Sequence, residues 1–374
     1  MTSTQTIEEL SAQYAAKYGI TREMIDHAER WTETDGDLEG LSEERVRGIL
    51  DMRFGAIAVD TPRSELWHTP DTIDVIEDIP YLPDGGYDTE AGQCRGHLLD
   101  LYLPHDAVLR CGHTLPVYID IHGGGFTYGY KELNRNFNVH LAETGFAVFS
   151  LNYRPAPQTD LRGQLADVQA ALRWIKAHLT DYPVNPNAVF LTGDSAGGAL
   201  TMLTLAIENN AEAAAAFGVD EPSGIGFAGA APVCGAYSSA SLETMGSELT
   251  VATIRIAAPD SNRCWASNSS TASKPPTRSS SPPKPGVQRQ PAATVHRDLR
   301  RRFPRADNLA LAAALARKGA DFELFDPKPR RHETLGHVFV IGMPCLTKAW
   351  NASNACAGSR TSAAESRMPA RDHA

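Results

Sequence analysis

The sequence predicts a doubly wound α/β domain with a mostly parallel central sheet, preceded by a helical segment. Residues 115–121 (LPVYIDI), 146–153 (FAVFSLNY) and 188–192 (AVFLT) are near-continuous apolar runs. Such runs are typical of strands that are buried on both faces of a parallel sheet. Helix-like segments, 134–143 and 165–179, separate the runs. Strand and helix in turn, joined by right-handed crossovers, give a doubly wound sheet.

The N-terminal part is expected to be helical. Leu10, Tyr14 and Tyr18 recur at helical spacing, and residues 46–52 repeat this pattern after a polar link. From about residue 72 the period changes to that of strands. The further elements expected from the pattern are strands at 73–79, 97–103 and 225–233, a helix at 199–209, a helix at 307–316 and a short strand at 322–325.

Two stretches break the alternation. Residues 261–302 are rich in Ser, Pro and basic residues, and Asp298 is their only acid. A long loop of this kind is uncommon inside a compact domain. The tail, 345–374, also lacks periodicity.

The composition argues against several classes of protein. Forty-five acidic residues outnumber 35 basic ones, which does not suit a nucleic-acid partner. No apolar stretch approaches the length needed to span a bilayer, and the first residues lack the pattern of a secretory signal. The six cysteines have neither metal-ligand nor paired spacing, as in reduced thiols. We therefore expect a cytoplasmic protein with no metal, no organic cofactor and no membrane association, and the oligomeric state stays open.

One motif predicts a catalytic serine. Residues 193–197 (Gly-Asp-Ser-Ala-Gly) follow the expected strand 188–192 and precede an apolar helix. This is the context of a nucleophile elbow, in which small neighbours allow a sharp turn that exposes the hydroxyl of Ser195. Taken alone, the motif is also compatible with a tight turn that has no chemical role.

A second motif precedes the first in the chain. Residues 122–125 (His-Gly-Gly-Gly) directly follow the expected strand 115–121. Consecutive glycines let backbone N–H groups approach a substrate closely, and loops of this kind supply oxyanion-hole donors. A phosphate loop is the alternative, but the Gly-Lys-Ser/Thr ending is missing. Together the two motifs predict serine-hydrolase chemistry.

The chain resembles the hormone-sensitive-lipase-like esterases of bacterial family IV, also called the α/β-hydrolase-fold-3 family. The matching residues are 122–125 (HGGG), 152–157 (NYRPAP) and 193–198 (GDSAGG). The resemblance runs over 73–233 and again over 307–339. It implies the α/β-hydrolase fold, with helices on both faces of a mostly parallel sheet and an N-terminal helical cap. The domains are then a cap segment, 1–65, a catalytic domain, 66–344, in which 261–305 is anomalous, and an irregular tail, 345–374.

The resemblance also implies roles for single residues. The serine attacks an ester carbonyl, and the amides of Gly123, Gly124 and Ala196 hold the oxyanion. The base is a histidine in a loop after the last strands. His337, in Gly-His-Val-Phe, fits this position better than His332, which lies among charged residues. Tyr153 and Arg154 are expected to have an architectural role beneath the site, and Asp194 to face away from the substrate.

The expected acid of the triad is missing from its place. A triad histidine needs a carboxylate to hold its tautomer. The family's aspartate position falls near Arg302, which cannot serve. Asp298 and Asp307 are the nearest carboxylates, and Asp307 is the candidate because it could reach inward from the first helical turn. One hypothesis explains the missing acid: residues 261–305 are translated out of frame. A shift of the reading frame by one nucleotide permits an apolar strand and an aspartate there.

These observations predict a carboxylesterase that hydrolyses small short-acyl esters through an acyl-enzyme, with activity reduced by the displaced acid. A catalytically impaired protein that binds a small apolar ligand on the same fold is the alternative from another class. An amidase or peptidase would share every motif with an esterase.

Overall fold

The computed structural model describes residues 5–83, 96–107, 115–237 and 305–326, together with Val338 and Ile341. Several sequence expectations therefore lie outside the described residues. The out-of-frame hypothesis is one of them, because nearly all of 261–305 is not described. The others concern the tail, 345–374, and the residues Asp298, Arg302, His332 and His337.

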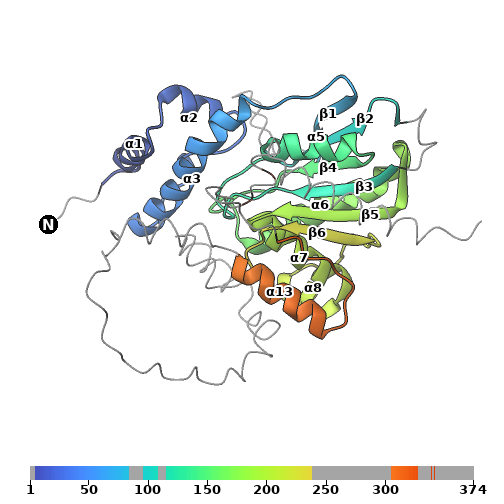
Figure 1. Ribbon diagram of the computed structural model, residues 1–374. Helices are drawn as coiled ribbons and strands as arrows, with labels where there is room; N and C mark the ends of the chain where they lie inside the picture. Colours follow the sequence, from blue (N-terminus) through green and yellow to red (C-terminus); the bar gives the residue numbers. More distant parts are fainter. Residues whose placement is uncertain are drawn as a thin grey trace, which may run out of the picture.

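A mixed sheet of six strands forms the centre of the described structure (Figure 1). The strand order is β1-β2-β4-β3-β5-β6. β1 and β2 run antiparallel to their neighbours, whereas β4, β3, β5 and β6 are parallel to one another. The predicted fold class is confirmed. The strands are β1 (Ile73–Pro80), β2 (Leu98–Pro104), β3 (Leu115–Ile121), β4 (Ala147–Leu151), β5 (Val184–Asp194) and β6 (Gly229–Val233).

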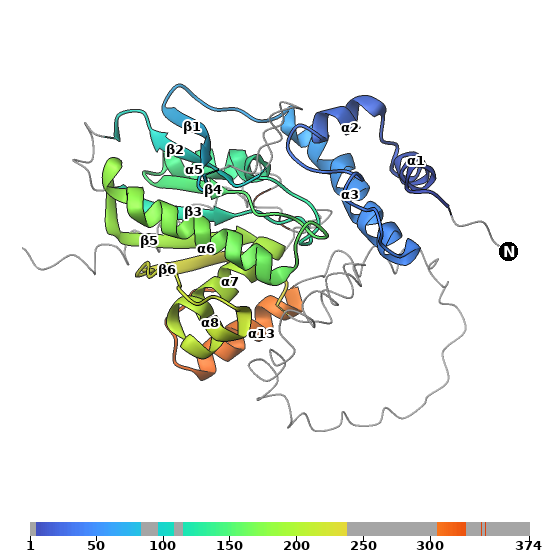
Figure 2. The ribbon, with the colours of Figure 1, turned by 180° about the vertical axis from the view of Figure 1, so that it is seen from behind.

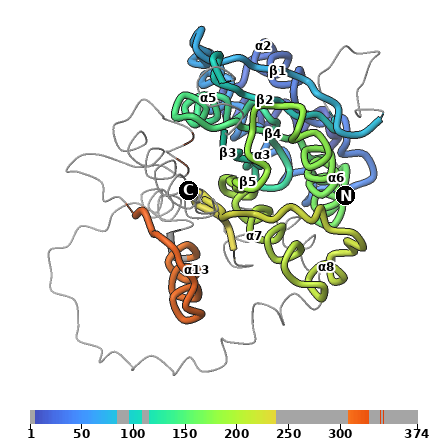
Figure 3. Tube along the Cα trace, turned by 90° about the vertical axis from the view of Figure 1, so that its right-hand side faces the viewer, coloured from blue at the N-terminus to red at the C-terminus, as the bar shows by residue number. Residues whose placement is uncertain are grey.

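Helices cover both faces of the sheet, as the buried strands require. α5 (Arg135–Glu143) packs Phe137 and Leu141 against Tyr118 on one face. The opposite face is covered by α6 (Leu161–His178), α7 (Ala196–Asn209) and α8 (Ala211–Phe217), and Figure 3 shows α5 and α6 on opposite sides of the strands. The other helices that the described residues form after residue 64 are η1 (Lys131–Asn134), η2 (Leu179–Asp181) and α13 (Arg305–Arg317).

Three N-terminal helices lie together at one end of the sheet (Figures 1 and 2). They are α1 (Ile7–Tyr18), α2 (Arg22–Ala28) and α3 (Glu43–Ser64), and Thr6, Thr21 and Ser42 cap their first turns. α3 buries an apolar stripe at helical spacing, which includes Val46, Ile49 and Ile57. This stripe shares a core with Tyr128, Tyr130, Leu133 and Ala156, which follow strands β3 and β4. The helices therefore pack on the loops at the carboxyl ends of the parallel strands.

One predicted element is wrong. Residues 321–326 form no strand, and Phe322, Leu324 and Phe325 are 38%, 49% and 49% exposed. A strand needs a neighbour that pairs with its N–H and C=O groups. Within the described ranges, no strand lies beside this segment, since β6 ends the sheet. No helix in the described parts of the chain is both long and apolar enough to cross a membrane.

Candidate active site

The two glycine motifs meet because they leave neighbouring parallel strands at the same level. Ile121, the last residue of β3, pairs with Gly193 near the end of β5. The carboxyl ends of parallel strands are the usual place for a site in an open α/β sheet. The approach is close, because a Cβ atom on Gly197 would lie 1.9 Å from the carbonyl oxygen of Ile121. Only glycine fits at that point.

Ser195 stands on the sharp turn between β5 and α7, which is the context the sequence predicted. Its backbone has φ 52° and ψ −113°, values that a non-glycine residue rarely adopts. Such strain costs on the order of 1–3 kcal/mol and persists only when neighbouring contacts impose it. Two backbone bonds do so here: the N–H of Ser195 donates to Val233 O at 3.0 Å, and its C=O accepts from Ala236 N at 3.2 Å. The residue is buried, with 4% of its surface exposed.

The glycine loop turns sharply after β3. The carbonyl of Gly124 accepts hydrogen bonds from Thr127 N and Tyr128 N, which closes the turn. Gly124 has φ +117°, and a Cβ there would lie 1.9 Å from Tyr128 O. Within the part of the chain that the structure describes, no acceptor is bonded to the N–H of Gly124 or to that of Ala196 at the start of α7. Both amides are thus available to an incoming oxygen.

Gly123, the third expected donor, has its N–H group engaged in the described structure. Its N–H donates to Oδ1 of Asp194 at 2.9 Å, in a buried setting. A donor engaged by a carboxylate does not serve an oxyanion at the same time. Of the three expected donors, only Gly124 and Ala196 have an N–H group without a bonded acceptor among the described residues.

A buried polar network lies beneath the loop. The buried carboxylate of Asp194 accepts from Gly123 N and from Nδ2 of Asn134. Asn134 also donates to Asp120. The carboxylate of Asp120 accepts further hydrogen bonds from Asn138 and Ser150. Burial raises the pKa of Asp120 to about 7 and also raises the pKa of Asp194. Sequence reasoning missed Asp120, although an aspartate within the apolar run LPVYIDI was a signal for it.

Tyr153, two residues after the end of β4, supports the glycine loop. Its hydroxyl donates to His122 O at 3.0 Å, and its ring stacks on the His122 imidazole with centroids 4.3 Å apart. Burial lowers the pKa of His122 to about 4, so this imidazole is neutral at pH 7. Arg154 pairs with the buried Asp167 through two of its nitrogens. These contacts match the architectural role that the sequence indicated for both residues.

Asp307 lies one loop away from the elbow. It sits in the first turn of α13, and its Oδ2 accepts from Tyr237 N at 3.0 Å. Beside it, Nδ2 of Asn308 donates to Gly235 O at 3.1 Å. Residues 235–237 follow β6, and Ala236 N bonds to the carbonyl of Ser195. The structure thus brings Asp307 near the serine's loop, but with its carboxylate engaged by a backbone amide.

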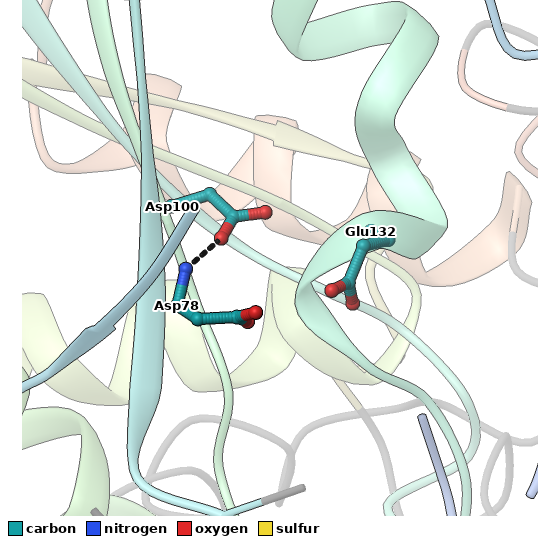
Figure 4. Close-up of side chains that lie close together, drawn as sticks. All are labelled: Asp78, Asp100 and Glu132. Carbon is teal, nitrogen blue, oxygen red and sulfur yellow. Dashed lines mark hydrogen bonds between the residues drawn. The ribbon is translucent and has the colours of Figure 1, made fainter. Parts of the chain in front are cut away.

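A group of three acidic side chains, Asp78, Asp100 and Glu132, is close enough together to hold a metal ion (Figure 4). Asp78 N donates to Asp100 Oδ1, as the dashed line marks. The Nζ atom of Lys131 already lies among them, 2.7 Å from Asp78 and 3.0 Å from Asp100, and it pairs with Glu132 too. The ammonium occupies the position a metal cation would take. Burial raises the pKa of Glu132 to about 7.

The strand order, the turn after β5 and the glycine loop after β3 define an α/β-hydrolase-fold protein. Residues 99–277 match the BD-FAE family, which confirms the α/β-hydrolase-fold-3 type that the three motifs indicated. The chain is similar to a probable carboxylic ester hydrolase, LipM, of Mycobacterium tuberculosis, with 36% identity over 31% of this chain and 27% of the relative. It is also similar to the esterase LipQ of the same organism, with 30% identity over 45% of this chain and 37% of the relative. The matched part thus spans about a third of each relative.

Solved structures bear out the fold. The crystal structure of esterase B from Lactobacillus rhamnosis superposes with a TM-score of 0.64. The superposition covers 87% of this chain and 96% of that one, at 22% sequence identity.

Proposed function

We propose that the protein is a carboxylic ester hydrolase with Ser195 as its nucleophile. One observation carries the proposal: the strained serine turn and two amides without a bound acceptor in the described structure, on Gly124 and Ala196, lie at the ends of adjacent strands. The names of the similar curated proteins, a probable carboxylic ester hydrolase and an esterase, support the same reaction class.

The reaction is a two-step acyl transfer. A histidine takes the proton from the Ser195 hydroxyl, whose oxygen attacks the ester carbonyl. The Gly124 and Ala196 amides stabilise the tetrahedral oxyanion, and each such donor is worth on the order of 3 kcal/mol. The alcohol leaves with the proton from the histidine. Water, activated by the same histidine, then cleaves the acyl-enzyme and releases the acid.

His337 is the proposed base. The backbone of Val338, its neighbour in the chain, is hydrogen-bonded to the thiol of Cys234, which directly follows β6. Val233, the residue before Cys234, accepts the N–H of Ser195. This proximity supports His337 over His332.

Asp307 remains the proposed acid, although Arg302 stands where the family has its aspartate. Its carboxylate would stay bonded to Tyr237 N and offer its second oxygen to the histidine. We expect a reduced rate, because a displaced carboxylate holds the imidazole less well.

The substrates we propose are small short-acyl esters, in line with the motif resemblance. Residues 1–65 act as a cap, a role supported by the contact of Met52 with Gly125 in the glycine loop. A cytoplasmic location remains a prediction from the sequence. The second candidate, an impaired protein that binds a small apolar ligand, is favoured by the bond between Asp307 and Tyr237 N.

The test is the release of p-nitrophenol from p-nitrophenyl acetate and butyrate. Turnover that disappears in Ser195→Ala and persists in Thr144→Ala establishes the proposed nucleophile. Thr144 is a suitable control because its hydroxyl bonds to Leu141 O, ahead of β4 and away from the carboxyl ends of the strands. Folded wild-type protein without turnover rules out the esterase and leaves the ligand-binding alternative. Parallel assays on the matching anilides separate an amidase from an esterase.

A further inference from the structure

Arg53 is a fully buried arginine in the middle of α3, and each of its five N–H groups has an acceptor. Nε donates to Thr127 O at 2.9 Å, and Nη2 donates to Ala156 O at 3.1 Å. The other three bonds go to the link between α2 and α3, namely to Thr34 O and to both carboxylate oxygens of Asp37. The side chain therefore joins two regions: the N-terminal helices and the loops after β3 and β4.

The two carbonyl acceptors outside the N-terminal helices, Thr127 O and Ala156 O, belong to the glycine loop and to a segment that is hydrogen-bonded to it. Thr127 N bonds to Gly124 O, so the residue that Arg53 holds is part of the turn that orients the Gly124 amide. Ala156 N donates to Phe126 O at 2.8 Å. Arg53 thus fixes the loop directly at Thr127 and again, through Ala156, at Phe126.

The neighbouring residue of α3 reaches the same loop. A Cβ placed on Gly125 would lie 2.8 Å from Cε of Met52, so the methionine side chain packs against this glycine. Two successive cap residues therefore contact the segment that carries a proposed oxyanion donor.

We infer that Arg53 is a positioning residue, which sets the glycine loop, and hence the Gly124 amide, from the N-terminal helices. The inference rests on the proposed function, because it assigns the Gly124 N–H to the oxyanion. Arg53 itself touches no substrate. Its effect is geometric: a guanidinium fork holds two carbonyls at fixed directions, which an ammonium cannot do.

The experiment compares Arg53→Lys with Asp37→Asn in the full chain, using p-nitrophenyl butyrate. Arg53→Lys keeps the charge but loses the fork on the loop, whereas Asp37→Asn weakens the ion pair and leaves both loop bonds. For a positioning role we expect kcat to fall by about 10–100-fold in Arg53→Lys with KM little changed, since errors near 1 Å in placement cost up to about 100-fold. Asp37→Asn is expected to lower the Tm while kcat stays near that of the wild type.

A double variant, Arg53→Gln with Asp37→Asn, serves if Arg53→Lys does not fold. It removes both charges of the buried pair together, which is far less disruptive than removing one. Its kcat is expected to fall as in Arg53→Lys, because a neutral amide makes at most two donor bonds.

Binding of a trifluoromethyl ketone provides a second readout, since the adduct with Ser195 places an oxyanion against the loop. We expect the inhibition constant to rise in proportion to the loss of kcat. Equal falls of kcat in the Arg53 and Asp37 variants, or unchanged kcat in every Arg53 variant, would overturn the role of Arg53 and leave the esterase intact. A wild-type protein that shows no Ser195-dependent turnover would overturn both the role of Arg53 and the proposed esterase function.

Discussion

Gly124→Ala provides the sharpest test of the glycine loop. The new Cβ would lie 1.9 Å from Tyr128 O, and real Cβ contacts stay at or above 3.0 Å, so the two backbones must separate by about 1 Å. The residue would also keep a φ of +117°, which costs a side chain on the order of 1–3 kcal/mol. Because the carbonyl of Gly124 closes the turn, the shift moves the proposed donor.

The expected result is a fall of kcat by about 100-fold, the usual consequence of a misplacement near 1 Å. Gly145→Ala is the matched control. Gly145 has φ +98°, and a Cβ atom placed on it would have nothing within 4 Å, so its substitution adds backbone strain without a clash. It lies between α5 and β4, away from the proposed site. Its Tm should fall by about 2–10 °C with kcat unchanged.

Hydrolysis of p-nitrophenyl butyrate and thermal unfolding of both variants supply the measurements. A Gly124→Ala variant that keeps kcat within about a factor of two, less than about 0.5 kcal/mol, would refute the reasoning. It would mean that the loop absorbs the clash without moving the Gly124 amide. A comparable loss of kcat in Gly145→Ala would also refute it, because general destabilisation would then explain both results.

Two further predictions concern the polar groups beneath the loop. The folded-state pKa of Asp120, about 7, lies above its ordinary 3.8, so its contribution to stability is complete at low pH and is lost as the pH rises through 7. The Tm of the wild type should therefore fall relative to that of Asp120→Asn between about pH 5 and pH 8, by the equivalent of at most about 3 kcal/mol, and parallel Tm curves would contradict the assignment. Tyr153→Phe removes the hydroxyl bond to His122 O and keeps the ring stacking, so we expect a loss of about 1 kcal/mol in unfolding free energy by urea titration. No measurable loss would show that the hydroxyl bond is not stabilising.

Local patterns in the sequence predicted much of the fold. The apolar run 115–121 coincides with β3, and the helix expected at 307–316 is found as α13. The serine motif lies between a strand and a helix, as its context indicated. The prediction of a short strand at 322–325 was wrong for a physical reason. A strand forms only beside a neighbouring strand that pairs with it, and the residues of the segment itself cannot supply that partner.

By itself, the sequence determined the sheet, the helices that cover it and the two motifs at its edge, because hydrophobic period and glycine spacing act over a few residues. Only the tertiary structure decided which polar groups meet. The bond from Gly123 N to Asp194 joins residues 71 positions apart, and that from Arg53 to Thr127 joins residues 74 apart. Each partner is selected when burial forces the polar group to find an acceptor within reach, and no local pattern specifies which acceptor that is.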